Sequence, residues 1–153
     1  MTIILGVDPG LQRTGWGIIT SESNKLCFVG CGVITSTADM PMAERLKQLH
    51  DGLIESIRAY GAEEAAVEET FMNNNAASAL KLGQARGAIL LALSLARLEV
   101  SEYSATIVKK SVVGKGHADK GQVAMMVKTL LPKSTAAKAD ASDALAVAIC
   151  HAH

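Results

Sequence analysis

Four acidic residues occupy positions where a carboxylate is costly to place. Asp8 directly follows the apolar run 2–7, and Glu68 lies at the end of a second apolar run, 65–68. Asp140 and Asp143 are three residues apart in an otherwise apolar stretch, so they share one face of the helix predicted there. Two strand ends and a helix can meet at one edge of a sheet, which would bring the four carboxylates together.

Carboxylates gathered in this way would repel one another and raise each other's pKa values, a penalty that divalent cations bound between them remove. Hard oxygen ligands select Mg²⁺ or Mn²⁺ over Zn²⁺. Two such ions, about 3.5–4 Å apart, can activate a water molecule and stabilise a leaving oxygen. The set of acids therefore suits two-metal hydrolysis of a phosphodiester.

Each acid also has a plainer interpretation. Asp8 precedes Pro and Gly and could be a turn residue. Asp140 could cap its helix, and Asp143 could be a first-turn acid favoured by the helix dipole. Glu68 is followed by Glu69, so either side chain could simply be solvated. Four acids at predicted edges, beside a lysine-rich region, favour the metal site over these alternatives.

The charges of the chain are balanced overall but unevenly spread. Residues 104–138 hold seven lysines against one aspartate, whereas the rest of the chain has eight basic and fourteen acidic residues. Such segregation predicts a basic region that meets phosphates. The alternative is a solvated lysine-rich surface.

Length and composition predict one globular domain over residues 1–153. Hydrophobic residues make up 49% of the chain, enough for a full core. No apolar run approaches the ~20 residues that span a bilayer, and Met1 leads into a strand-like run without a secretory signal. Three cysteines, an odd number, fit a reducing compartment. We therefore expect a cytoplasmic protein without membrane contact.

The pattern of apolar residues predicts an α/β fold on a mixed sheet. Three antiparallel strands are expected first, with Gly30 and Gly32 marking a bulge in the third. A helix, a strand, a long helix and a fifth strand follow, and three further helices complete the chain. The predicted strands are 2–7, 16–21, 25–35, 65–69 and 100–103, and the predicted helices are 41–60, 75–98, 106–113, 120–131 and 139–153.

The long helix predicted over 75–98 is apolar on nearly every side in its second half, 88–98. One small domain covers only one face of a helix, so the other face is expected to meet a second subunit. Gly83 and Gly87 would let two helices approach closely there. A fully buried central helix is the alternative.

Six segments, in order, resemble the RuvC family of Holliday junction resolvases, within the ribonuclease H-like nuclease superfamily. The most specific is Leu-Gly-Gln-Ala-Arg-Gly at 82–87. The segments are 3–10, 14–17, 67–72, 78–87, 112–116 and 139–146. The resemblance implies a ribonuclease H-like fold with three antiparallel strands followed by two crossover strands. The family's catalytic and metal-binding acids fall on Asp8, Glu68, Asp140 and Asp143.

The resemblance also implies an activity and its partners. Family members are structure-selective endodeoxyribonucleases that resolve four-way DNA junctions in recombination and repair by paired symmetric nicks. They are Mg²⁺-dependent hydrolases, with two ions expected per active site and Mn²⁺ as a substitute. The implied partners are junction DNA, a second copy bound through the 75–98 helix, and the RuvA–RuvB branch-migration complex.

Several residues match the family's DNA contacts. Phe71 matches an aromatic that stacks on an unpaired base, although it could instead cap the core. Lys109 and Lys120 match residues used at DNA phosphates. Lys115, Lys81 and Arg86 are weaker candidates. Arg86 has a second interpretation, a role in the dimer interface or a buried ion pair.

Histidines and cysteines are not predicted to form the main site. Cys27 and Cys31, four apart on a strand, are expected on one face, and the segment 150–153 resembles part of a metal site. Zinc needs four converging ligands, which a fraying chain end does not favour. His117, in the glycine-containing loop before Lys120, could contact a phosphate or lie near the reacting centre.

Other functions also stay open at this level. The opening Gly-Val-Asp-Pro-Gly resembles the phosphate-binding turn of actin-like ATPases and sugar kinases, which need two such domains around a nucleotide. A small resolvase-like family of ribosomal RNA processing shares the fold but lacks the Leu-Gly-Gln-Ala-Arg-Gly helix. A junction-binding protein without nuclease activity is a further alternative, against which the intact set of acids argues.

Overall fold

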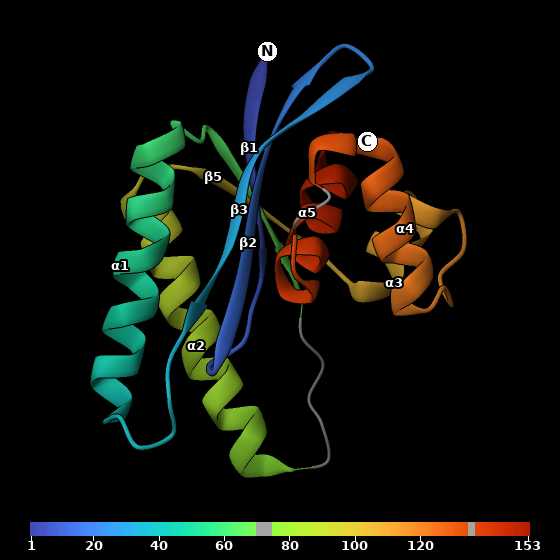
Figure 1. Cartoon of the computed structure of the whole chain (residues 1–153). Helices are drawn as coiled ribbons and strands as arrows, with labels where there is room; N and C mark the ends of the chain where they lie inside the picture. Colours follow the sequence, from blue (N-terminus) through green and yellow to red (C-terminus); the bar gives the residue numbers. More distant parts are fainter. Residues whose placement is uncertain (70–74, 135–136) are drawn as a thin grey trace.

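A computed structural model of the chain describes residues 1–69, 75–134 and 137–153. Its centre is a five-stranded mixed sheet with helices on both faces (Figure 1). The strand order is β3-β2-β1-β4-β5; β1, β2 and β3 pair antiparallel, and β4 and β5 continue the sheet in parallel with β1. This confirms the predicted sheet. The strands are β1 (Thr2–Asp8), β2 (Arg13–Glu22), β3 (Lys25–Thr35), β4 (Glu64–Glu68) and β5 (Glu99–Tyr103).

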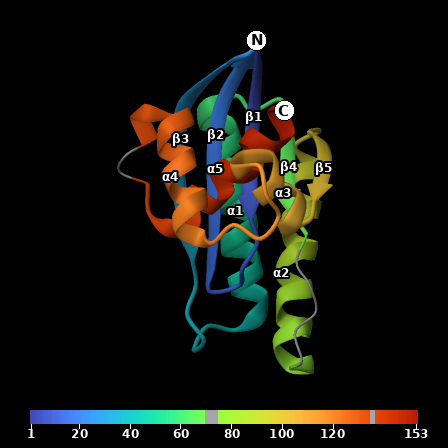
Figure 2. The same ribbon diagram turned by 90° about the vertical axis from the view of Figure 1, so that its right-hand side faces the viewer.

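The helices divide between the two faces of the sheet (Figures 1 and 2). One face is covered by α1 (Met42–Tyr60) and α2 (Ala76–Leu95), with Leu53 and Ile89 fully buried beneath them. The other is covered by α5 (Ala139–Ala152), backed by α3 (Ala105–Val113) and α4 (Lys120–Leu130), and Pro132–Ser134 forms a 3-10 turn. Across the described residues, no helix combines the length and apolar character that crossing a bilayer requires.

Glycines let α5 lie directly on the sheet. A Cβ atom placed on Gly6 would overlap the backbone oxygen of Ala144, and one on Gly15 would overlap the backbone oxygen of Asp140. Any larger residue at these positions would therefore push the helix away from β1 and β2. This contact fixes the position of the first turn of α5, which carries Asp140, and Asp143 follows one turn later.

The long helix is shorter than its predicted range, 75–98. It begins after Asn75, whose side chain accepts a hydrogen bond from the Ser78 backbone, and ends at Leu95. The prediction of a helix to residue 98 is wrong because Arg97 adopts a left-handed conformation with φ 64°. The Leu98 N–H then donates to the Leu93 carbonyl, and the Arg97 N–H donates to the Ser94 carbonyl. These are the two hydrogen bonds of a Schellman motif, which ends the helix.

A bulge in β3 changes which residues share a face. Ile18 pairs with Gly30 and Ile19 with Phe28, so Val29 is the extra residue, next to the predicted Gly30. Phe28 and Cys31 both pack on the α5 side of the sheet. Cys27, adjacent to Phe28 on a pleated strand, therefore lies on the opposite face from Cys31. The expectation that the two cysteines share a face is wrong.

Other boundaries differ by a few residues. The second strand begins at Arg13 instead of residue 16, because its pairing with β1 and β3 continues to the turn. The fourth strand is shifted by one residue, to Glu64–Glu68. His151, part of the C-terminal segment considered for metal binding, is held between the Glu64 carboxylate and the Tyr103 hydroxyl, each at 2.7 Å.

Candidate active site

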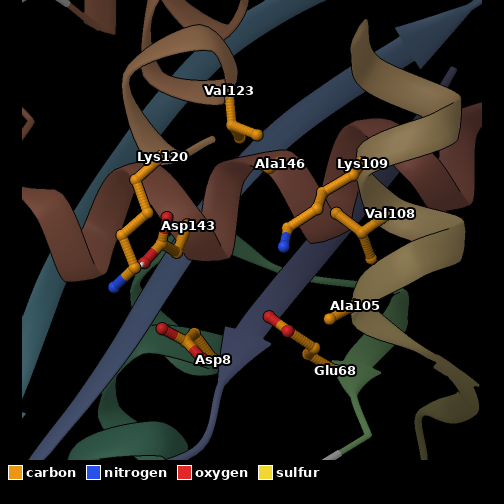
Figure 3. A pocket seen from close by; sticks show the side chains of 9 residues that line it. All are labelled: Asp8, Glu68, Ala105, Val108, Lys109, Lys120, Val123, Asp143 and Ala146. Atoms are coloured by element: carbon orange, nitrogen blue, oxygen red, sulfur yellow. Dashed lines mark ion pairs between the residues drawn. The ribbon is translucent and has the colours of Figure 1, made fainter. Parts of the chain in front are cut away.

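The parallel pairing of β1 and β4 places two acids side by side. Val7 is in register with Val67, so Asp8 and Glu68, the last residues of the two strands, lie next to each other at one end of the sheet. The residues that directly precede the two acids, 4–7 and 65–67, are apolar and buried, which fixes the strand ends in the sheet. Asp143, one turn into α5, faces this edge from above the sheet (Figure 3).

These three acids line one pocket with two lysines. The pocket has a volume of about 200 Å³. In Figure 3 the carboxylates of Asp8, Glu68 and Asp143 and the amine of Lys109 face this space, whereas the amine of Lys120, whose side chain is 89% exposed, lies at its edge beside Asp143. Acids from three separate elements thus face one space, and a lysine from α3 and a lysine from α4 also line it. The remaining lining is apolar: Ala105, Val108, Val123 and Ala146.

Asp140 lies beside this pocket instead of lining it. Its Oδ2 is 4.0 Å from Nη1 of Arg13, and its side chain is 33% exposed. Its negative charge still raises the pKa of Asp8 and of Asp143, so it belongs to the same charged group. The structure therefore brings together three of the four predicted acids and places the fourth next to them.

The strongest electrostatic effect falls on Asp8. The pKa of its carboxyl is raised from an ordinary value near 3.8 to about 8, chiefly by burial and then by the charges of Glu68, Asp143 and Asp140, in that order. Lys120 opposes the shift. Desolvation and the repulsion of three other acids therefore oppose the ionisation of Asp8 in the folded protein.

The two lysines offset part of this repulsion. Burial raises the pKa values of Glu68 and Asp143, whereas the positive charges of Lys109 and Lys120 lower both. Lys120 Nζ lies 4.0 Å from Asp143 Oδ2. Its position at the start of α4 is fixed by the preceding Asp119, which forms a capping box with Gln122.

The donor set suits a hard divalent cation. Among the described residues, no three Asp, Glu, His or Cys side chains are already arranged to hold one ion together. The pocket nevertheless presents carboxylate oxygens, the ligands that Mg²⁺ and Mn²⁺ prefer. Burial and the neighbouring acids raise the pKa of Asp8, and a bound cation would favour its ionised form. The residues present therefore fit a metal site.

Arg86 is engaged by protein groups. Its Nη1 donates to the backbone oxygen of Glu68 at 2.9 Å, and its Nη2 forms an ion pair with Glu102. The side chain is only 18% exposed. Of the two interpretations that the sequence left open for Arg86, the structure thus shows the ion pair. Sequence analysis missed Glu102, since it has no motif around it.

The remaining predicted DNA contacts lie outside the pocket lining. Lys81 is exposed on α2, and Lys115 and His117 are exposed in the loop between α3 and α4. The prediction for Phe71 falls on residues 70–74, outside the part of the chain that the structure describes.

The turn after β1 depends on residues that sequence analysis did not single out. Ser36 donates its hydroxyl to the Leu11 carbonyl at 2.8 Å, and Arg45 Nε donates to Ser36 Oγ at 2.8 Å. Arg45 is 7% exposed on α1. This chain of bonds ties the turn that follows Asp8 to the helix behind the sheet.

The β3-β2-β1-β4-β5 mixed sheet, with helices on both faces, defines a ribonuclease H-like fold, and acids lie at the neighbouring ends of β1 and β4. The family model described as crossover junction endodeoxyribonuclease RuvC matches residues 4–151. The chain belongs to the RuvC family.

Individual relatives agree with the family match. The chain is 58% identical over 153 residues to a crossover junction endodeoxyribonuclease RuvC of Gluconacetobacter diazotrophicus, covering 100% of this chain and 91% of that protein. A RuvC of Paramagnetospirillum magneticum is 62% identical over 150 residues, covering 98% and 90%.

Solved structures are similar over nearly the whole chain. The Thermus thermophilus RuvC structure has a TM-score of 0.89 and 33% identity, and T. thermophilus RuvC in complex with Holliday junction substrate has a TM-score of 0.92 and 32% identity. Each covers 99% of this chain and 93% of its own. The predicted fold class and family are confirmed.

Proposed function

We propose that this chain is a structure-selective endodeoxyribonuclease that resolves four-way (Holliday) DNA junctions by paired symmetric nicks. Asp8, Glu68, Asp140 and Asp143 would hold two Mg²⁺ ions, for which Mn²⁺ can substitute. The observation that carries the proposal is the shared pocket of three acids and two lysines. The similarity to T. thermophilus RuvC in complex with Holliday junction substrate supports a four-way junction as the substrate.

The acids, the lysines and the apolar residues of the pocket would have different roles in hydrolysis. When bound, the metal ions supply an activated water and stabilise the leaving oxygen. Asp8, Glu68, Asp140 and Asp143 would hold these ions through their carboxylate oxygens. Lys109 and Lys120 attract the scissile phosphate. The apolar side chains of Val108 and Val123 exclude water on one side and so strengthen each of these charge interactions.

The exposed face of α2 supports the homodimer. Leu80, Leu91 and Leu95 are 66%, 57% and 63% exposed, and their spacing places them on one side of the helix. Gly87 lies on the same side, with open space where a Cβ atom would be. A two-fold dimer through this face would present two pockets to two DNA strands of like polarity, which accounts for symmetric nicking.

Further contacts complete the proposal. Phe71 would stack on an unpaired base near the crossover, and Lys115 and Lys81 would add phosphate contacts. We also place the protein in the cytoplasm, with the RuvA–RuvB branch-migration complex as a partner, on the basis of family membership.

The test is cleavage of a synthetic mobile four-way junction in Mg²⁺, with linear duplex as control substrate. We expect paired symmetric nicks in the junction and little cutting of the duplex. Asp8→Asn should abolish nicking and leave junction binding within a few-fold, whereas Glu55→Gln, an acid-to-amide change on the exposed side of α1, should cut normally. Junction binding without nicking by the unaltered chain, or nicking by Asp8→Asn, would contradict the proposal.

A further inference from the structure

Arg86 joins three elements that meet behind the candidate active site. It lies on α2, and one guanidinium group contacts the last residue of β4 and the penultimate residue of β5. The bond to the Glu68 oxygen is 2.9 Å long, and the partner on β5 is the carboxylate of Glu102. A planar guanidinium can serve two such acceptors at once, whereas a lysine amine presents a single point of charge.

The first contact restrains the main chain of Glu68. The pairing of β4 with β1 ends at Val67, so on that side Glu68 has already left the sheet. On the other side, the Glu69 N–H donates to the Tyr103 oxygen at 2.7 Å. The bond from Arg86 to the Glu68 oxygen therefore supplies a second restraint at the point where the strand ends.

The second contact restrains the start of α3. Glu102 lies two residues before Ser104, whose side chain caps α3 by accepting from the Ile107 N–H at 3.2 Å. That helix carries Lys109, which lines the pocket opposite Glu68 (Figure 3). A single side chain is thus bonded to the strand that bears the acid and to the segment that leads to the lysine.

We propose that Arg86 is a positioning residue, which sets Glu68 against Lys109 in the pocket, and that it is not a DNA contact. This inference rests on the proposed function, because it assigns Arg86 a part in the same site. The limited exposure of the side chain, 18%, and its two protein partners leave little of the guanidinium for a phosphate.

The test compares Arg86→Lys with Arg58→Lys, the same change at an exposed arginine in the last turn of α1. Three quantities are measured for each variant: the single-turnover cutting rate at saturating protein, junction affinity without metal, and amide hydrogen exchange of the metal-free protein. For Arg86→Lys we expect at least a ten-fold slower rate and an affinity within two-fold of the unaltered chain. Exchange should rise at residues 66–69 and stay unchanged in β1 and β2. Arg58→Lys should change none of the three.

A second variant, Glu102→Gln, tests the two contacts of Arg86 separately. Glu102→Gln removes the ion pair and leaves the bond from Arg86 to the Glu68 oxygen. We expect a rate between those of the unaltered chain and Arg86→Lys, with exchange at 66–69 raised less.

Three results would overturn the inference. Arg86 would be a DNA contact if Arg86→Lys bound the junction more weakly, with a salt dependence reduced by about one phosphate contact, and cut at a normal rate at saturation. Faster exchange throughout the sheet with a normal rate would make its role one of general stability. An unchanged rate with unchanged exchange would remove any role. An unaltered chain that cuts no junction would refute the proposed function alone, and exchange at 66–69 would still decide whether Arg86 restrains Glu68.

Discussion

Replacing Asp8 by Asn should stabilise the metal-free protein while it removes activity. The unfolded chain releases the Asp8 proton near its ordinary pKa of 3.8, whereas the folded chain retains it up to a pKa of about 8. Between these values the folded state binds more protons, so the free energy of unfolding of the unaltered chain falls as pH rises. Asn has no proton to lose. The advantage of Asp8→Asn is therefore absent below pH 3.8 and complete above pH 8.

The size of the effect follows from the same shift. A pKa displaced from 3.8 to about 8 corresponds to at most ~5–6 kcal/mol, at ~1.36 kcal/mol per unit. The pocket is open to solvent, and salt screens part of the repulsion, so we expect about 2 kcal/mol to be measured. For a chain of this length that raises Tm by roughly 4–8 °C.

The assay is thermal unfolding in a chelator at about pH 4.5 and about pH 8.5, with Glu55→Gln as the matched control. Asp8→Asn should unfold at a higher temperature than the unaltered chain at the higher pH and at nearly the same temperature at the lower pH. Replacing the chelator with Mg²⁺ should raise the Tm of the unaltered chain and leave that of the variant almost unchanged. An equal Tm difference at both pH values would refute the reasoning, because the cost of ionising Asp8 in the folded protein would then not be the cause.

Three further predictions concern the seat of α5, the lysines and the dimer face. Gly15→Ala should lower Tm by roughly 4–8 °C, through about 2 kcal/mol of overpacking against Asp140, and slow cutting; an unchanged melting curve would contradict the close contact. Lys120→Ala should weaken junction binding and reduce its salt dependence by about one phosphate contact, measured by titration over a salt series; an unchanged slope would argue against this contact. Leu91→Glu should yield monomers in sedimentation equilibrium with an unchanged circular dichroism spectrum, whereas a persisting dimer would place the interface elsewhere.

The elements that carry the acids could be predicted because their sequences are simple. β1 and β4 are buried on both faces, and such strands appear as continuous apolar runs that end in an acid. α5 is apolar nearly all round because it lies between the sheet and two other helices. Strand ends and helix spacing are therefore sufficient to predict that Asp8, Glu68 and Asp143 come together.

Features that depend on distant contacts or on one backbone angle could not be predicted. The end of α2 rests on a left-handed Arg97, a conformation that sequence rules assign to glycine. The side of the sheet on which Cys27 lies rests on a single extra residue, Val29. Neither partner of Arg86 is near it in the chain, and no local pattern marks Glu102 as its counterion.

The contact between α5 and the glycines of β1 and β2 has a consequence for how the protein is made. During translation β1 and β2 are synthesised first, whereas α5, the last helix of the described chain, leaves the ribosome after every other element. A nascent chain that has not yet reached residue 139, or a product of premature termination there, has Asp8 and Glu68 but lacks the other two acids. Such an unfinished polypeptide lacks half of the acids of the proposed metal site, so under the proposed function a cell that abandons its synthesis would release no fragment able to nick DNA.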